Sequence, residues 1–138
     1  MPGPVEQACK VGATLGEGPY WSEGEGKLWF VDIKEQKIHR FDPGADRLES
    51  WNAPAQPGWI FPTDSGRMVA GLQSGIHMFD PASGSFELLA APEASEPGNR
   101  LNDAVIDRFG AIWFGSMDDG ETRAASSITD FILKRRTP

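Results

Sequence analysis

One six-residue pattern occurs twice in this chain and constrains its fold more than any other feature. KIHRFDP from Lys37 and GIHMFDP from Gly75 both contain I-H-x-F-D-P, and their Asp-Pro pairs lie 38 residues apart. An Asp side chain can accept hydrogen bonds from the N–H groups of a turn, and Pro fixes φ, so each pair is expected to open a tight turn. The pattern predicts a structural unit that repeats about every 40 residues.

Three segments each contain a turn glycine followed by an apolar run of strand length, and two of them precede a copy of the pattern. Gly26, Gly66 and Gly110 lie 40 and 44 residues apart, within EGKLWFVDI, SGRMVAGLQ and FGAIWFGSM. A period of about 40–45 residues built from four strands is typical of a β-propeller blade. Because such a ring closes with at least four blades, and more usually with six or seven, we expect an all-β chain that forms two to three blades of an incomplete propeller.

Composition and charge narrow the partners that such a chain can have. The net charge of −7 lacks the electrostatic footprint of a nucleic-acid binder, and no apolar run is long enough to span a membrane. The N-terminus shows no secretory signal, and the single cysteine, Cys9, cannot form an internal disulfide. We therefore expect a cytoplasmic protein with neither nucleic acid nor membrane as a partner.

The aromatic and histidine residues have a structural interpretation. The five tryptophans are expected to supply bulk between packed sheets (Trp21, Trp29, Trp51, Trp59 and Trp113). His39 and His77 occupy the same position of successive repeats. Because the two histidines belong to separate blades, their repeat position explains the pairing, and we do not assign them to a metal site.

Two stretches are more specific than the repeat requires. The first begins at Leu15 and contains L-G-E-G-P-x-W, V-D-I and I-H-R-F-D-P; the second begins at Gly98 and contains N-R-x-N-D followed by G-S-M. Together they resemble the gluconolactonase and regucalcin family, also called the senescence-marker-protein family, from about Ala13 to Glu121. The resemblance covers the N-terminal half of that family's fold. It implies a six-bladed propeller with one divalent metal on its axis, sugar-lactone hydrolysis in some members and calcium binding in others.

Glu17 is the candidate metal ligand. It lies between Gly16 and Gly18, just before Pro19. The glycines permit unusual φ values and a close backbone approach, and the proline stiffens the chain, which suits a carboxylate held at a fixed angle. The resemblance implies that Glu17 is the family's first ligand for Ca²⁺, with Zn²⁺, Mg²⁺ or Mn²⁺ as alternatives. Without the resemblance, an exposed turn glutamate would be the simpler interpretation.

Arg100, Asn102 and Asp119 are the candidate substrate-binding residues. Arg and Asn present several donors in defined planes, which suits a polyhydroxylated substrate, and the resemblance implies that Arg100 and Asn102 contact the sugar. Asp119 is the choice for an acidic contact after G-S-M, and Asp103 is expected to support the site. The alternatives are a loop whose Asn and Asp bind local backbone groups and a solvated acidic segment.

The resemblance also implies residues that this sequence does not contain. In the family the metal and a nearby carboxylate or water open the ester, and two further ligands lie in N-G-L and P-D-G stretches, neither of which occurs here. The catalytic acid or base is therefore unassigned, and we expect lactonase activity to be impaired or absent in this chain. The alternatives are a calcium-binding protein without turnover, or a half propeller that acts as a binding and assembly module and self-associates through open blade edges.

The last segment does not continue the repeat. We assign residues 1–124 to the N-terminal blades and residues 125–138, ASSITDFILKRRTP, to a non-family tail. Adding one base before possible codons for Thr129–Leu133 gives a frame that encodes Tyr-Arg-Leu-His-Pro, which matches the strand expected next in the family. A one-base frameshift is therefore our hypothesis for the tail, and a genuine divergent C-terminus is the alternative. As written, the tail is expected to be poorly ordered or loosely docked.

Overall fold

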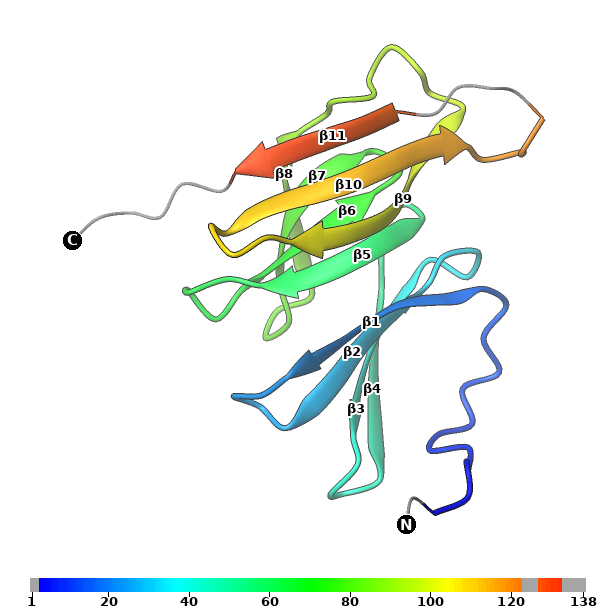
Figure 1. The fold of residues 1–138 in the computed structure, drawn as a ribbon, viewed down its shortest axis with the longest axis vertical. Coiled ribbons are helices and arrows are strands. Elements are labelled where there is room, and N and C mark those ends of the chain that lie inside the picture. The colour runs from blue at the N-terminus through cyan, green and yellow to red at the C-terminus, as the bar shows by residue number, and fades with distance from the viewer. Residues whose placement is uncertain (1–2, 123–126, 133–138) are drawn as a thin grey trace.

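The computed structural model describes residues 3–122 and 127–132, and in these residues it contains strands and no helix. Eleven strands form three antiparallel sheets with the orders β1-β2-β3-β4, β5-β6-β7-β8 and β11-β10-β9 (Figure 1). The first strands of the three sheets, β1, β5 and β9, lie next to one another. This arrangement confirms the prediction of an all-β partial propeller.

Each sheet corresponds to one blade. The first comprises β1 (Gly16–Ser22), β2 (Lys27–Asp32), β3 (Lys37–Asp42) and β4 (Arg47–Asn52). The second comprises β5 (Pro57–Pro62), β6 (Met68–Leu72), β7 (Gly75–Asp80) and β8 (Ser85–Ala90). The third comprises β9 (Asn99–Ile106), β10 (Ala111–Asp118) and β11 (Ser127–Ile132).

The repeated Asp-Pro pairs form the turns that the sequence predicts. Asp42 Oδ1 accepts hydrogen bonds from the backbone N–H groups of Gly44 at 3.0 Å and Ala45 at 3.2 Å. In the second sheet, Asp80 Oδ1 accepts from the Ala82 N–H at 3.0 Å. The two turns connect the third and fourth strands of their sheets, so the repeat fixes the same hairpin twice.

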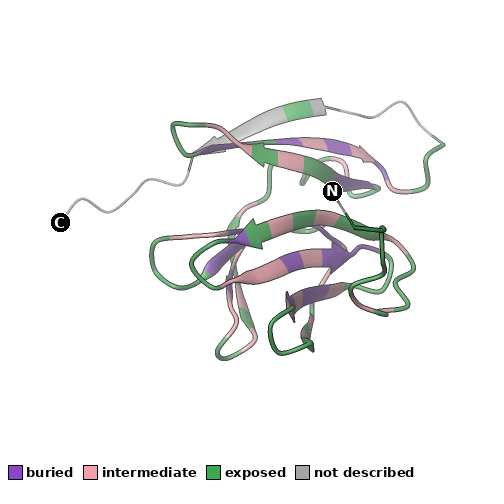
Figure 2. Ribbon diagram, turned by 60° about the horizontal axis from the view of Figure 1, so that its bottom comes forward, coloured by how far each residue is buried: buried purple, intermediate pink, exposed green. Residues whose placement is uncertain are grey.

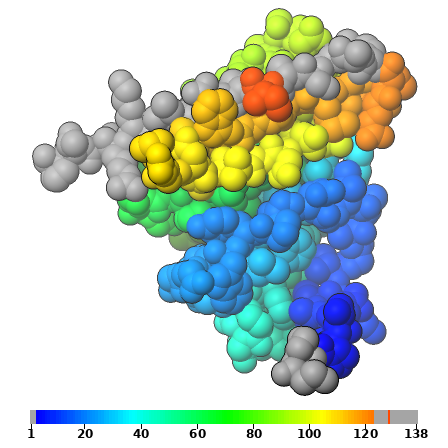
Figure 3. All heavy atoms as spheres, in the orientation of Figure 1, coloured from blue at the N-terminus to red at the C-terminus, as the bar shows by residue number. Residues whose placement is uncertain are grey.

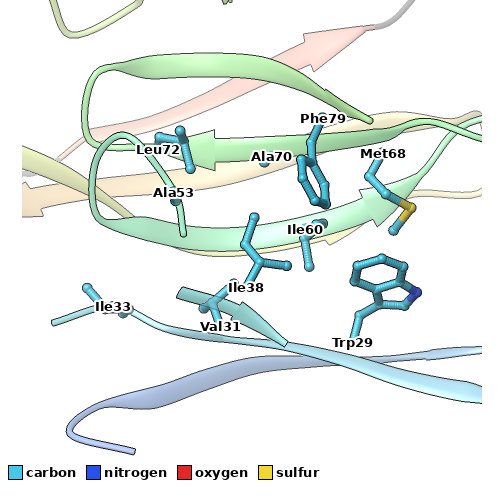
Figure 4. Close-up of a cluster of buried hydrophobic side chains, with 10 residues drawn as sticks. All are labelled: Trp29, Val31, Ile33, Ile38, Ala53, Ile60, Met68, Ala70, Leu72 and Phe79. Carbon is cyan, nitrogen blue, oxygen red and sulfur yellow. The ribbon is translucent and has the colours of Figure 1, made fainter. Parts of the chain in front are cut away.

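Two apolar layers hold the three sheets together. The layer between the first and second sheets is centred on Trp29, Ile38 and Phe79, and Figure 4 shows these side chains pointing toward one another from the two sheets. The layer between the second and third sheets contains Trp59 and Phe114, whose ring centroids lie 5.7 Å apart. Figure 2 shows buried residues on the facing strands and exposed ones in the loops.

The second sheet is covered on both faces, and this explains its composition. Every residue of β6 is buried, and its sequence, MVAGL, is apolar throughout, as expected for a strand without a solvent face. On the first sheet, the N-terminal segment lies along the outer surface (Figure 3), where Ala8 and Val11 border a cavity with Phe30 and Phe41. The first and third sheets therefore each pack on the second through one face.

The prediction for the tryptophans is confirmed for three of the five. Trp29 and Trp59 are buried, and Trp51 stacks on Trp29 with 5.5 Å between ring centroids. The prediction is wrong for Trp21 and Trp113, which are 43% and 44% exposed. Successive side chains of a strand point to opposite faces, and these two lie on the faces turned away from the second sheet.

Part of the tail is structured. Ser127–Ile132 forms β11, which pairs antiparallel with β10 from Ala111↔Ile132 to Ser116↔Ser127. This pairing differs from the loose docking expected from the sequence, and it supplies the third sheet with its third strand. The frameshift itself stays a hypothesis, and residues 123–126 and 133–138 lie outside the described residues.

Candidate ligand site at the start of the inner strands

Each of the three inner strands bulges at nearly the same level. The pairing of β1 with β2 shifts between Glu17 and Tyr20, and that of β5 with β6 shifts between Pro57 and Trp59. In the third sheet the shift places Asn102 and Asp103 opposite a single residue of β10. A bulge adds one residue to a strand and changes the direction of its side chains, so these irregularities mark a candidate site.

Glycines allow the inner strands to approach closely at this level. A Cβ atom on Gly58 would lie 2.5 Å from the Leu101 carbonyl oxygen and 2.7 Å from that of Asn102. Gly18, at φ +62°, faces the carbonyl oxygen of Gly58. Only glycine fits a backbone contact this close, so the sequence brings β1, β5 and β9 together where they bulge.

Glu17 lies at the start of β1, opposite Val31 of β2. Its side chain is exposed, and no hydrogen bond or ion pair to another described residue engages its carboxylate. It also borders the cavity under the N-terminal segment, which has a volume of about 450 Å³. The Glu17 carboxylate is therefore unengaged among the described residues, and its role as a metal ligand stays a prediction.

The described residues do not complete a metal centre around Glu17. Among them no group of three or more His, Cys, Asp or Glu side chains could hold a metal ion. Ca²⁺ takes six to eight oxygen ligands, of which Glu17 can provide one or two. The residues present thus fit one ligand position of the implied metal, and no chemical step is derived through it.

Arg100 is buried at the start of β9. Only 5% of the residue is exposed, and Nε lies 3.2 Å from Asp119 Oδ1 as an ion pair. Within the described part of the chain, Nε and Nη1 have no hydrogen-bond partner. Buried donors are normally paired, so this guanidinium retains hydrogen-bonding capacity for another group.

Asp119 links Arg100 to the other two sheets. Its Oδ1 accepts a hydrogen bond from Lys34 Nζ at 2.8 Å, and its Oδ2 accepts one from Gln56 Nε2 at 3.1 Å. The hydrogen bond from Lys34 is the main cause that lowers the pKa of Asp119; partial burial opposes it, while Gln56 and the positive charges of Lys34 and Arg100 reinforce it. The structure thus unites the predicted Arg100 and Asp119 with Lys34 and Gln56, which sequence reasoning missed.

Asn102 and Asp103 lie in the bulge of β9 and are exposed. Asp103 Oδ1 accepts a hydrogen bond from the Ala104 N–H at 2.9 Å, a local contact of the kind considered for this loop. No described hydrogen bond joins Asn102 to Arg100 or Asp119. Asn102 therefore lies near Arg100 on β9, and its side-chain amide is available to a ligand.

The fold and the site define a partial β-propeller with polar residues at the start of its inner strands. The chain belongs to the SMP-30/gluconolactonase/LRE-like family, whose model matches residues 15–133. This confirms the resemblance found in the sequence, and the match continues past Glu121 through β11.

Curated relatives with this similarity include a regucalcin and a lactonase. Regucalcin of Xenopus laevis is 34% identical over 115 residues, which cover 82% of this chain and 38% of the relative. L-arabinolactonase of Azospirillum brasilense is 33% identical over 108 residues, which cover 78% and 36%. The chain thus spans less than half the length of these relatives.

Solved structures show the same likeness. A calcium-binding protein, regucalcin, from Agrobacterium tumefaciens superposes with a TM-score of 0.82 at 28% identity, over 86% of this chain and 40% of that one. A gluconolactonase from Xanthomonas campestris gives a TM-score of 0.67 at 25% identity, over 86% and 44%. Both matches involve only part of the solved chains.

Proposed function

We propose that this chain forms the N-terminal blades of a metal-dependent sugar-lactone hydrolase. The observation that carries the proposal is the buried Arg100, which has donors without partners among the described residues and lies beside Asp119 at the start of an inner strand. The similarity to an L-arabinolactonase and a gluconolactonase supports a sugar lactone as the substrate class. A cytoplasmic location is also part of the proposal. Separately, the described residues contain no helix that is long and apolar enough to cross a membrane.

Each predicted residue has a role in this proposal. Arg100 and Asn102 donate hydrogen bonds to oxygens of the sugar lactone, and Asp119 accepts a hydrogen bond from a hydroxyl group. Glu17 provides one carboxylate ligand to a divalent cation, Ca²⁺ or in its place Zn²⁺, Mg²⁺ or Mn²⁺. Such a cation would supply electrostatic polarisation of the lactone carbonyl. The catalytic acid or base remains unassigned among these residues, so turnover by this chain alone is expected to be impaired or absent.

A calcium-binding protein without turnover is the second candidate. It is favoured by the similarity to the regucalcins of Xenopus laevis and Agrobacterium tumefaciens, the latter described as a calcium-binding protein. An ion buffer needs no polar contacts for a sugar, whereas Arg100 and Asn102 offer such contacts. These two residues favour the enzyme.

Self-association is a third candidate activity for a chain with these open faces. The outer face of the third sheet exposes Val105, Trp113 and Ile128, which lie around one hollow. Exposed apolar surface next to a sheet edge promotes association with another chain. Sedimentation velocity distinguishes a defined dimer, which supports this candidate, from a monomer or an open-ended aggregate.

Separate variants test the two halves of the proposed site. Glu17→Gln should weaken Ca²⁺ binding at least about tenfold, because it replaces a charged ligand by a neutral one, and should leave gluconate binding unchanged. Asn102→Ala and Arg100→Lys should weaken gluconate binding and leave Ca²⁺ binding unchanged. Isothermal titration with CaCl₂ and with sodium gluconate, the stable hydrolysis product of gluconolactone, provides both measurements. Equal Ca²⁺ affinity in Glu17→Gln and the parent would remove Glu17 from the site, and absence of gluconate binding in the parent would remove the substrate role.

The gene sequence provides an independent test of the tail. Re-sequencing across the codons for Ala125–Lys134, and onward past Pro138, detects a missing base directly. If one more base is present and N-G-L and P-D-G follow in frame, the restored protein should hydrolyse gluconolactone in a pH-stat assay. If the bases stand as translated, the frameshift hypothesis is wrong.

A further inference from the structure

A polar network joins all three sheets at the candidate site, and the proposed function uses only its third-sheet members. Lys34 comes from the loop after β2, Gln56 from the segment before β5, and Asp119 from the segment after β10. Lys34 Nζ and Gln56 Nε2 both donate to the Asp119 carboxylate, which is the counter-ion of the buried Arg100. The two donors thus reach from the first and second sheets to the group that neutralises Arg100.

We propose that Lys34 and Gln56 are positioning residues, which hold the Asp119 carboxylate against Arg100 and so fix the direction of the guanidinium at the site. This inference rests on the proposed function, because it gives the two residues a role through Arg100. Neither residue belongs to the predicted contact set, and neither is required to touch the sugar.

The geometry around Asp119 restrains its carboxylate. Lys34 Nζ lies 2.8 Å from Oδ1, which also faces Arg100 Nε at 3.2 Å, and Gln56 Nε2 lies 3.1 Å from Oδ2. The Asp119 N–H donates to the Gly98 carbonyl at 2.9 Å and anchors the backbone. Because two hydrogen bonds and one ion pair engage its two oxygens, rotation of the carboxylate breaks at least one contact.

Lys34 is presented by a tightly bonded loop. The Gln36 N–H donates to the Ile33 carbonyl at 3.3 Å, and the Gln36 carbonyl accepts from the Ala53 N–H at 2.8 Å. Asp32 Oδ1 also accepts from the Glu35 N–H at 3.4 Å. The backbone that carries Lys34 is therefore fixed on both sides, so the contact with Asp119 costs side-chain rotamer entropy but little further backbone entropy.

Gln56 is held by the second sheet in a similar way. Its carbonyl accepts a hydrogen bond from the Gln73 N–H at 2.8 Å, and its Nε2 donates to Gln73 Oε1 at 3.1 Å. The same Nε2 supplies the hydrogen bond to Asp119. An amide fixed at both its backbone and its side chain can orient a neighbour, as outer residues do around an ordered ligand site.

A matched pair of lysine variants tests the inference on the chain itself. Lys34→Met removes the donor to Asp119, and Lys37→Met removes a lysine three residues away that donates to Asn52 Oδ1 at 3.1 Å. Both changes lower the positive charge by one at a partly exposed side chain, so both variants should fold. Lys34→Arg serves as the rescue, because a guanidinium can donate to the same carboxylate.

The readouts are the Arg100 Nε–H signal and the Asp119 carboxyl titration by NMR, together with the affinity for gluconate. In Lys34→Met the Arg100 signal should shift, the pKa of Asp119 should rise toward its ordinary value, and gluconate binding should weaken about five- to tenfold. Lys37→Met should match the parent in all three, and Lys34→Arg should recover most of the loss.

The outcomes separate this inference from the proposed function. If Lys34→Met leaves the Arg100 and Asp119 signals as they are in Lys37→Met, the positioning role is overturned, whether or not gluconate binds. If both signals change but the gluconate affinity of a binding-competent parent does not, the role at the site is likewise overturned. If the parent does not bind gluconate, the proposed substrate role fails, and the two NMR signals alone decide whether Lys34 orients Arg100.

Discussion

The first and second sheets place very different residues at one equivalent position of their inner strands. In the first sheet Val31 pairs with Ile38 on one side and with Glu17 on the other. In the second sheet Gly71 pairs with Ile76 and with Trp59. Ile38 and Ile76 are the isoleucines of the repeated I-H-x-F-D-P pattern, so Glu17 and Trp59 correspond.

The cross-strand partner distinguishes the two uses of this position. Gly71 leaves space for the Trp59 indole, which lies over it and is only 1% exposed. Val31 fills the corresponding space in the first sheet, and Glu17 is exposed there. The same backbone position thus holds a candidate ligand in the first blade and a buried core residue in the second. The residue opposite it is the larger Val31 in the first blade and Gly71 in the second.

Replacing Gly71 by a larger residue should have the largest effect on the free energy of unfolding. In Gly71→Ala the new Cβ would lie 2.1 Å from Trp59 Cε2 and 2.3 Å from Nε1, so the buried indole must move. Overpacking of this kind costs about 3 kcal/mol of unfolding free energy. Urea unfolding followed by tryptophan fluorescence measures the change.

A smaller side chain at position 59 provides the control. Trp59→Leu is itself destabilising, because it removes buried aromatic volume, but it leaves room above Gly71. Adding Gly71→Ala to Trp59→Leu should therefore cost much less than adding it to the parent chain. An equal cost in both backgrounds would mean that the indole is not what requires glycine at this position.

Local patterns predicted much of the fold, because they act within one repeat. The Asp42 and Asp80 turns follow from residues two or three positions apart, and the structure confirms both. The correspondence of Glu17 with Trp59 was not visible, because Ile38 lies 21 positions after Glu17 but Ile76 lies 17 positions after Trp59; the bulge after Glu17 and the unequal loops account for the difference. A bulge alters which residues face each other without leaving a reliable signal in the sequence.

The site was predicted in part, for a similar reason. Arg100 and Asp119 were chosen from motifs, and the structure brings them together. Lys34 was missed because its partner Asp119 lies 85 residues away, in another blade. Contacts between blades depend on how the sheets pack, which short motifs do not specify.

Replacing Arg40, in the third strand of the first sheet, should have a moderate effect on the free energy of unfolding. Arg40 pairs with Trp29, and its counterpart in the second sheet is Met78, which pairs with Val69. The Arg40 guanidinium lies 5.0 Å from the Trp29 ring centroid and forms ion pairs with Glu25 and Glu49. Arg40→Met keeps the apolar stem but removes these interactions, so it should cost about 1 kcal/mol.

Arg67→Met, in the loop between β5 and β6, is the matched control for that change. Arg67 is more exposed, and its Nη1 lies 3.9 Å from Glu87 Oε2, so its loss should cost less than about 0.5 kcal/mol. Urea unfolding at low and high NaCl measures both variants. If the two substitutions are equally mild, the cluster of Arg40 with Trp29 contributes no more than an ordinary surface ion pair.

His39 should have the smallest effect on stability, and this effect should depend on pH. Burial lowers the pKa of His39 below its ordinary 6.5, an effect that nearby Asp32 opposes and Lys37 reinforces. As the pH falls through 6.5, the unfolded chain therefore binds a proton before the folded chain does. Stability should decline over that interval and stop declining through this group once the pH is below the pKa of folded His39.

The chain has two histidines, so His77→Asn leaves His39 as the single titrating imidazole. His39 Nδ1 lies 2.7 Å from Ser50 Oγ, and an Asn side chain can keep that hydrogen bond without titrating. In the His77→Asn background, adding His39→Asn should flatten the pH dependence of unfolding below about pH 6.5, and NMR should show His39 of the parent titrating below that value. Titration of His39 at or above its ordinary pKa would mean that its position in the first sheet does not exclude water.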